Sequence, residues 1–377
     1  AEESVVLLKN QDNLLPLKFS GLNSIAVIGP NANQVEYGDY SISKDNSTGV
    51  TILEGIKNIT KDKIKVNYAR GCGITSLDSS GFKEAVDAAY NSDVVVLVIG
   101  GSSMSLSGVG WGELADQGGY PTGGEGYDRS ELTPPGIQPE LIRAISKTGK
   151  PIILVMVHGR PYSIPWEKEH IPAILDAWYP GEEGGNAVAR ILFGEVVPSG
   201  KLTMSVPQSA GHVPVFYNYK PSGRGIYHKP GSPGNPGRDY VFSPTDPLFP
   251  FGYGLSYTAF EYSDLNIKQK KLKETDTIEL TIKVKNVGSI TGKEVVQVYI
   301  NDKISSVTTP VKVLKGFKKI EIRPSKTTVL SFRIPCNELG LWDKHMHYTV
   351  EPGEFEIMIG ASAEDIRLKD RINITGT

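Results

Sequence analysis

Val94-Val95-Val96-Leu97-Val98-Ile99 is an uninterrupted apolar run, and it decides the fold of the first half of the chain. A strand without a polar face must be covered on both sides, which is typical of parallel sheets flanked by helices. Residues 24–28 and 152–157 have the same character. Helical spacing of apolar residues over 81–91 and 139–147 places helices between such strands. The alternation predicts an α/β domain with a mostly parallel sheet.

The second half of the chain has a different period. Ile278, Leu280, Ile282 and Val284 alternate with polar residues, which is the pattern of a strand with one buried face. Similar short runs, separated by Gly- and Pro-containing turns, continue to residue 359. They predict an all-β sandwich of the immunoglobulin or fibronectin kind.

The stretch between the two patterns is rich in Gly, Pro, Tyr and Phe. A flexible linker lacks aromatic residues, so we expect this stretch to be ordered by packing against a domain surface. The predicted organisation has four parts: a lead-in segment (1–20), an α/β domain (21–208), an aromatic connector (209–262) and a β-sandwich domain (263–377).

Composition excludes several classes of protein. The 377 residues carry 40 Lys and Arg against 42 Asp and Glu, so the formal charge of −2 argues against a nucleic-acid binder. Charged residues interrupt every apolar run before it could span a membrane. The two cysteines, Cys72 and Cys336, fall in different predicted domains and are expected to be free thiols. No Gly-x-Gly-x-x-Gly fingerprint follows a strand, which argues against a nucleotide cofactor.

A long segment without clear periodicity follows the strand at 94–99 and runs to Gln138. Ligands of parallel α/β domains bind at the carboxyl ends of strands, and loops of this length are usually functional or disordered. The segment contains Trp111, Tyr127, Glu113 and Glu125. Aromatic faces stack on sugars and carboxylates bind their hydroxyls, so the composition suits a sugar site. An exposed loop with ordinary charges is the alternative.

Glu125 is the most constrained carboxylate of this segment, because glycines flank it on both sides. A glycoside hydrolase needs a carboxyl group that protonates the leaving oxygen, and burial under a bound sugar would raise the pKa of Glu125 for that task. The adjacent Asp128 and Arg129 favour a charge pair or a helix cap over catalysis. His158, at the end of a strand, is either a ligand contact or a buried, hydrogen-bonded histidine. His345 and His347 lack partners for a metal site, and none is expected.

Several motifs, in order along the chain, resemble the second and third domains of glycoside hydrolase family 3. They are Ile25-Ala26-Val27-Ile28-Gly29-Pro30-Asn31-Ala32, Glu125-Gly126-Tyr127-Asp128-Arg129, Trp178-Tyr179-Pro180-Gly181-Glu182-Glu183-Gly184-Gly185, Pro198-Ser199-Gly200-Lys201-Leu202 and Pro250-Phe251-Gly252-Tyr253-Gly254-Leu255-Ser256-Tyr257-Thr258. The resemblance covers nearly the whole chain and implies a layered α/β sandwich followed by a fibronectin type III-like domain.

The resemblance also implies an activity: retaining, exo-acting hydrolysis of terminal β-linked sugars, of the β-glucosidase or β-xylosidase type, without a cofactor or metal. Glu125 best matches the family's general acid/base, with Glu113 as the second candidate. Residues assigned to substrate binding are Trp111, Tyr127, Asp128, Arg129 and His158.

The family's nucleophile is an aspartate on a (β/α)₈ barrel, and neither the barrel nor the nucleophile motif is present in these residues. We therefore expect this chain alone to be inactive or very weak, and to need a barrel in cis or in trans. The family resemblance suggests a bacterial protein that is periplasmic or secreted, with a cytoplasmic location as the alternative. The rival hypothesis is a non-catalytic carbohydrate-binding or scaffolding protein with the same fold.

Overall fold

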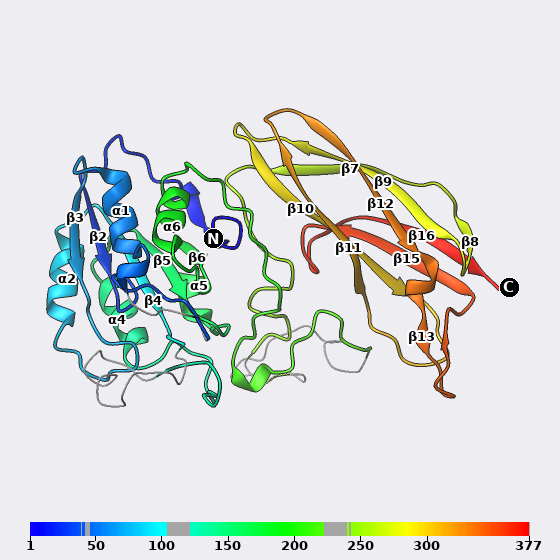
Figure 1. Cartoon of the computed structure of the whole chain (residues 1–377), viewed down its shortest axis with the longest axis horizontal. Helices are drawn as coiled ribbons and strands as arrows, with labels where there is room; N and C mark the ends of the chain where they lie inside the picture. The colour runs from blue at the N-terminus through cyan, green and yellow to red at the C-terminus, as the bar shows by residue number, and fades with distance from the viewer. Residues whose placement is uncertain (39, 42–45, 104–120, 222–239, 241–242, 377) are drawn as a thin grey trace, which may run out of the picture. The chain divides into compact units, whose positions relative to one another are not determined.

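The computed structural model of the chain is shown in Figure 1 and describes residues 1–377 except 39, 42–45, 104–120, 222–239, 241–242 and 377. The chain forms two compact units. The α/β unit comprises residues 1–200 and 207–213, and the β unit comprises residues 201–206 and 214–377. The finer boundaries after residues 20, 208 and 262 stay predictions.

Strands and helices alternate in the α/β unit. In chain order they are β1 (Val6–Asn10), β2 (Ser24–Ile28), α1 (Ile52–Thr60), β3 (Lys65–Ala69), α2 (Phe82–Tyr90), β4 (Val94–Gly100), α4 (Gln138–Ser146), β5 (Ile152–Val157), α5 (Pro165–His170), β6 (Ala173–Asp176) and α6 (Gly184–Leu192).

These strands form one six-stranded sheet in the order β1-β6-β5-β4-β2-β3. Strands β2 to β6 are parallel, and β1 joins the edge antiparallel to β6, with Val6 opposite Asp176. From β2 the chain first crosses to β3 and then returns past β2 to β4, β5 and β6, and the helices pack in two groups, with α1 beside α6 and α2 beside α4 (Figure 1). Every residue of β4 and β5 is buried. The predicted α/β sandwich with a mostly parallel sheet is confirmed.

Two helices were not anticipated from the apolar pattern, α1 and α5. Helix α1 begins with a capping box: Thr51 Oγ1 accepts from the Glu54 N–H at 3.1 Å, and the Glu54 carboxylate accepts from the Thr51 N–H at 2.9 Å. Its backbone approaches α6 so closely that a Cβ at Gly55 would lie 2.1 Å from the Gly185 carbonyl oxygen. Glycine at both positions therefore allows the two helices to pack in contact.

The β unit is a sandwich of two sheets. Its strands are β7 (Phe260–Ile267), β8 (Lys271–Lys273), β9 (Thr277–Asn286), β10 (Gly292–Asp302), β11 (Val313–Ile322), β12 (Thr327–Pro335), β13 (Leu341–Trp342), β14 (Tyr348–Thr349), β15 (Gly353–Gly360) and β16 (Ile366–Thr375). One sheet has the order β11-β10-β15-β16-β8 and the other β12-β9-β7.

The core of the sandwich lies where the period-two pattern places it. Alternate residues of β9 are buried, and they pack in one apolar cluster with buried residues of β10 and β15 from the other sheet. All pairs within the two sheets are antiparallel except β16 with β8. The predicted all-β sandwich is confirmed.

The aromatic connector contributes at least one ring to the β unit. Tyr217 stacks on Phe251, with ring centroids 4.2 Å apart, and meets the ring of Tyr299 in β10 edge-on at 5.8 Å. Its hydroxyl accepts a hydrogen bond from the Leu314 N–H at 3.3 Å. The Gly/Pro-rich part at 222–239 lies outside the described residues.

Both cysteines are free and buried, in separate units. Burial raises the pKa of the Cys72 thiol to about 12 and that of Cys336 to about 11, so both stay protonated at neutral pH. Among the described residues, no helix has the length and apolar character needed to cross a membrane.

Asn286 holds the turn between β9 and β10. Its buried amide donates to the carbonyls of Ile290 and Ile322, both at 2.8 Å, and its oxygen accepts from Thr258 Oγ1 at 2.7 Å. Asn286→Ala leaves these buried groups unpaired and should lower the free energy of unfolding by about 2–4 kcal/mol. Urea denaturation measures this, with the exposed Asn373→Ala on β16 as the control. Equal stability of the two variants would contradict the role given to Asn286.

Candidate functional site

The candidate site is a glycine-rich turn near the carboxyl ends of the parallel strands. The Tyr127 N–H donates to the Gly124 carbonyl oxygen at 3.2 Å and closes a turn with Glu125 at its second position. Gly124 and Gly126 have φ values of +116° and +77°. A positive φ at the third position of a turn favours glycine, so the sequence Gly-Glu-Gly fits this backbone. The turn therefore presents Glu125 at its tip.

Backbone pairing ties the turn to the end of β4. The Thr122 N–H donates to the Ser102 carbonyl oxygen at 2.9 Å, and the Ser102 N–H donates back to Thr122 Oγ1 at 3.1 Å. Ser103 and Gly123 form the next bridge. A Cβ at Gly101 would lie 2.0 Å from Thr122 Oγ1, so only glycine permits this approach. The long segment after β4 thus returns to the carboxyl end of the same strand just before Glu125.

The Glu125 side chain is exposed to solvent in the chain by itself. The Tyr40 hydroxyl donates a hydrogen bond to Glu125 Oε2. Tyr40 has a left-handed backbone with φ +57°, an uncommon conformation for a tyrosine. Tyr40 was missed by sequence reasoning, because nothing in its neighbourhood marks it as a partner of a carboxylate 85 residues away.

Arg160, which follows the carboxyl end of β5, is a second residue that the sequence did not reveal. Its Nη2 donates to the Tyr127 carbonyl oxygen and to Asp128 Oδ1, both at 2.8 Å. Asp128 thus forms a charge pair, one of the two structural roles considered for it, but its partner is Arg160 and not the adjacent Arg129. Neighbouring side chains of an extended segment point apart, whereas the ends of β4 and β5 meet at one edge of the sheet.

Arg129 turns the other way, toward the buried side of the same segment. Its Nη2 donates to the Thr133 carbonyl oxygen at 2.6 Å, and its guanidinium lies 5.6 Å from the centre of the Tyr162 ring. Burial raises the pKa of the Tyr162 hydroxyl to about 12, so it stays protonated. Arg129 therefore links the far end of the segment to the core.

His158 directly follows β5 and is buried, which agrees with the burial expected in one of the two alternatives for this residue. Its Nε2 lies 3.1 Å from Oδ1 of Asp176, the last residue of β6, and both side chains are only 2% exposed. Its ring packs against Tyr162 and Trp178 at centroid distances of 4.6 and 5.1 Å. In this chain by itself His158 is enclosed by protein atoms.

Trp111 and Glu113, the other aromatic and carboxylate candidates of the loop, lie outside the described residues. The structure thus places Glu125 and Tyr127 in one turn and Asp128 directly after it, whereas Arg129 and His158 both lie against the Tyr162 ring. In the described part of the chain, no group of three or more His, Cys, Asp and Glu side chains could hold a metal ion.

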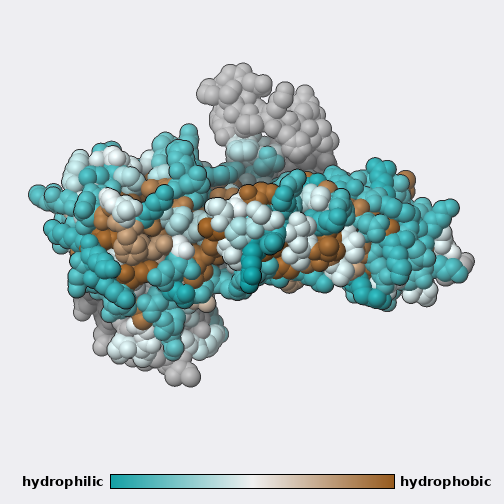
Figure 2. All heavy atoms as spheres, turned by 90° about the horizontal axis from the view of Figure 1, so that it is seen from above, coloured by the Kyte–Doolittle hydropathy of each residue, from teal (hydrophilic) through white to brown (hydrophobic). Residues whose placement is uncertain are grey.

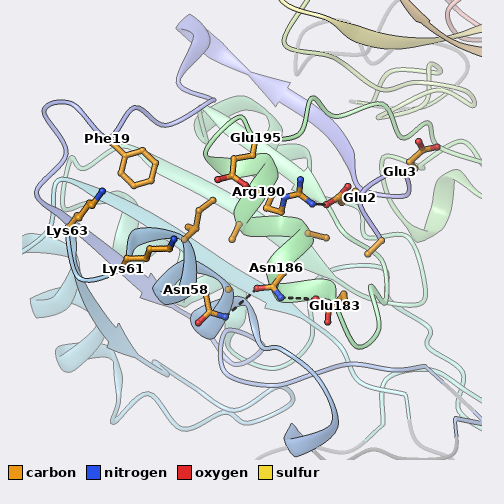
Figure 3. Close-up of a pocket in the computed structure, with 15 residues that line it drawn as sticks. Glu2, Glu3, Phe19, Asn58, Lys61, Lys63, Glu183, Asn186, Arg190 and Glu195 are labelled. Carbon is orange, nitrogen blue, oxygen red and sulfur yellow. Dashed lines mark hydrogen bonds and ion pairs between the residues drawn. The ribbon is translucent and has the colours of Figure 1, made fainter.

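A separate hollow of about 920 Å³ lies on the outer surface of α1 and α6 (Figure 3). The described site residues do not line it. In this hollow Arg190 donates to the Glu2 carboxylate, and its Nε donates to Glu195 Oε2 at 3.3 Å. The Asn186 amide donates to Glu183 Oε2 at 2.7 Å. Three of its four acidic side chains, Glu2, Glu183 and Glu195, thus bind neighbouring side chains of the hollow itself.

The surface of the α/β unit also has an exposed hydrophobic area. On the face shown in Figure 2, hydrophobic residues at the left gather in one area bounded by hydrophilic ones. Phe19, which lines the hollow and is 44% exposed, stacks on Phe193 with centroids 4.8 Å apart. Such patches are common on single units and do not by themselves identify a ligand.

Comparison with known proteins places this geometry in a family. The profile of the glycosyl hydrolase family 3 C-terminal domain matches residues 5–257, and that of the fibronectin type III-like domain matches residues 294–363. The chain is 42% identical to a β-xylosidase of Formosa agariphila over 98% of its own length and 48% of the relative. It is 38% identical to a periplasmic β-glucosidase of Salmonella typhimurium, over 97% and 48%.

Solved structures of β-glucosidases have the same fold as this chain. A β-glucosidase of Erythrobacter marinus, at 36% identity, superposes with a TM-score of 0.85 over 99% of this chain and 49% of that one. A β-glucosidase of Listeria innocua in complex with glucose, at 30% identity, gives 0.84 over 99% and 48%. The chain spans about half the length of the relatives it matches. From the Gly-Glu-Gly turn, the layered sheet and these matches we conclude that the chain belongs to glycosyl hydrolase family 3, as its C-terminal domain followed by a fibronectin type III-like domain.

Proposed function

We propose that this chain is the acid/base-bearing portion of a retaining, exo-acting β-glycosidase of the β-glucosidase or β-xylosidase type. Glu125 is the general acid/base, and the aspartate nucleophile comes from a (β/α)₈ barrel in cis or in trans. The observation that carries the proposal is the exposed Glu125 at the tip of a glycine turn that is tied to the carboxyl end of β4. The greater length of the relatives supports the barrel.

The reaction has two steps. In the first, the barrel aspartate attacks the anomeric carbon while the Glu125 carboxyl gives its proton to the leaving oxygen, so that the glycosidic bond breaks as the glycosyl-enzyme bond forms. In the second, the Glu125 carboxylate takes a proton from water, which attacks the anomeric carbon and releases the aspartate. Retention requires the two carboxyl groups to be about 5–5.5 Å apart. A tip position suits Glu125, because it can enter a sugar site formed by another domain.

Complementation with the barrel tests the proposal. This chain alone should not turn over an aryl β-glucoside or β-xyloside, because it lacks the residue that supplies the covalent route. The same chain joined to a family 3 barrel, or mixed with one, should hydrolyse the substrate and release the β-anomer first, as NMR spectroscopy detects.

Two results would overturn the proposal. Turnover by the chain alone at the rate of the joined protein would show that the nucleophile lies elsewhere. Tight binding of glucose or cellobiose by the chain alone, measured by calorimetry, without activity in the joined protein would favour a carbohydrate-binding protein.

A further inference from the structure

We propose that Arg160 is a positioning residue, which holds the 124–127 turn in place and thereby directs Glu125 at the leaving oxygen. The inference rests on the proposed role of Glu125. It assigns a task to a side chain that comes from the end of β5, outside the segment that carries the carboxyl group.

Arg160 contacts the turn on both sides of Glu125. After Glu125, its Nη2 donates to the Tyr127 carbonyl oxygen and to the Asp128 carboxylate, each at 2.8 Å. Before Glu125, its stem lies over Gly123, where an added Cβ would be 3.5 Å from Nε and 3.9 Å from Cδ. One side chain thus bridges the two ends of the turn.

The turn needs such a support, because its own backbone is weakly constrained. Glycines flank Glu125, and glycine has the largest range of backbone conformations in the absence of other contacts. The turn has a single internal backbone bond, from the Tyr127 N–H to the Gly124 carbonyl. Arg160 binds the carbonyl of the same Tyr127, so its loss would release the end of the turn that follows Glu125.

The backbone contact, and not the ion pair, carries most of this effect. The Asp128 side chain is 92% exposed and that of Arg160 is 37% exposed. An ion pair with so exposed a partner contributes little, because water screens it. The bond to the Tyr127 carbonyl is part-buried and charge-assisted, which makes it the stronger of the two. Removing Asp128 should therefore disturb the turn less than removing Arg160.

The position of Arg160 is itself fixed by the fold. It follows His158, whose ring is buried at the end of β5, and Gly159, where a Cβ would lie 2.6 Å from the Tyr179 ring. Pro161 comes directly after it and restricts the backbone of Arg160 to extended conformations. A rigid strand end thus supports a flexible turn, which is how a reactive group on a loop is held within reach of its target.

The first experiment uses this chain as it is. Arg160→Met keeps the stem over Gly123 but removes the donors. Hydrogen exchange followed by mass spectrometry should show at least tenfold faster exchange in peptides that cover residues 123–131, with peptides from β4 and β5 unchanged. Arg371→Met, which removes an exposed arginine from β16, is the control and should leave exchange at 123–131 unchanged. Unchanged exchange at 123–131 in Arg160→Met would refute the clamp.

The second experiment uses the barrel-containing protein and varies the leaving group. Arg160→Met should lower kcat/KM about 10–10²-fold for an alkyl β-glycoside, whose leaving oxygen must be protonated. For a dinitrophenyl β-glycoside, whose leaving group needs no proton, kcat/KM should change less than threefold. Arg160→Lys, which retains one charged donor, should restore part of the difference. A loss of equal size for both substrates would show a general structural role and overturn the proposal.

The two proposals fail in different ways. If Glu125→Gln itself lacks the leaving-group dependence, the acid/base assignment is wrong whatever Arg160 does. If Glu125→Gln has it and Arg160→Met does not, only the positioning role of Arg160 is refuted.

Discussion

Replacing Glu125 by glutamine in the barrel-containing protein is expected to lower kcat/KM for an alkyl β-glycoside about 10²–10⁴-fold. Glutamine has nearly the shape of glutamate but has no proton to give to the leaving oxygen. For a dinitrophenyl β-glycoside, kcat/KM should remain close to that of the wild type, because bond cleavage then needs no acid. Initial-rate kinetics with a series of leaving groups measures both quantities.

Azide distinguishes an acid/base residue from one that only binds the sugar. In Glu125→Ala the dinitrophenyl substrate still forms the glycosyl-enzyme, but water lacks a base in the second step. Azide is a nucleophile that needs no base, so added azide should raise kcat for this substrate at least tenfold. The product should be the β-glycosyl azide, identified by NMR spectroscopy.

Glu131 supplies a matched control for Glu125, because it is an exposed glutamate of the same segment. Glu131→Gln should leave kcat/KM unchanged for both substrates and give no response to azide. A Glu125→Gln variant that behaves like Glu131→Gln would refute the assignment. If the Glu113 variants, and not the Glu125 variants, show the leaving-group dependence and the azide response, Glu113 is the general acid/base.

The strands of the α/β unit were predictable because their signal is local. Val94–Ile99 and Ile152–Val157 are continuous apolar runs of strand length, and burial on both faces leaves no other use for them. Strand β1 was less evident, since the predicted lead-in segment pairs only with β6, more than 160 residues further along. Helix α1 was missed although Thr51 and Glu54 form the Thr-x-x-Glu signature of a capping box.

In the candidate site, too, the features that depend on the local sequence could be predicted, and the contacts between distant residues could not. Glu125 could be singled out because its two glycines adjoin it in sequence, and the turn they allow is a local property. The residues that contact the turn could not be predicted, because they are distant in sequence: Arg160 is 33 residues from Tyr127, and Tyr40 is 85 residues from Glu125. One signal in the sequence could have pointed to Arg160. Arg160 follows β5, the long segment with Glu125 follows β4, and these neighbouring parallel strands end at the same edge of the sheet.

The turn after β2 shows how strongly the site depends on close backbone contacts, and Gly29→Ala should measure that dependence. Gly29 has φ +124°, and an added Cβ would lie 1.9 Å from the Val98 carbonyl oxygen of β4. The backbone must then shift against a buried sheet, and alanine disfavours this φ as well. Strain of about 1–3 kcal/mol from each cause predicts a free energy of unfolding lowered by about 2–6 kcal/mol.

Gly149→Ala separates these two causes, because Gly149 also has a positive φ, +72°, but nothing lies within 4 Å of its added Cβ. Only the backbone cost of about 1–2 kcal/mol should appear there. Scanning calorimetry, which follows the α/β unit apart from the β unit where their transitions separate, measures both variants. A loss in Gly29→Ala no greater than in Gly149→Ala would contradict the steric explanation. If Gly29→Ala is the more destabilising variant, the backbone shift should also disturb the candidate site. Asn31, two residues after Gly29, donates a hydrogen bond to the Gly101 carbonyl oxygen at 2.9 Å, and Gly101 packs against Thr122, which precedes the Glu125 turn.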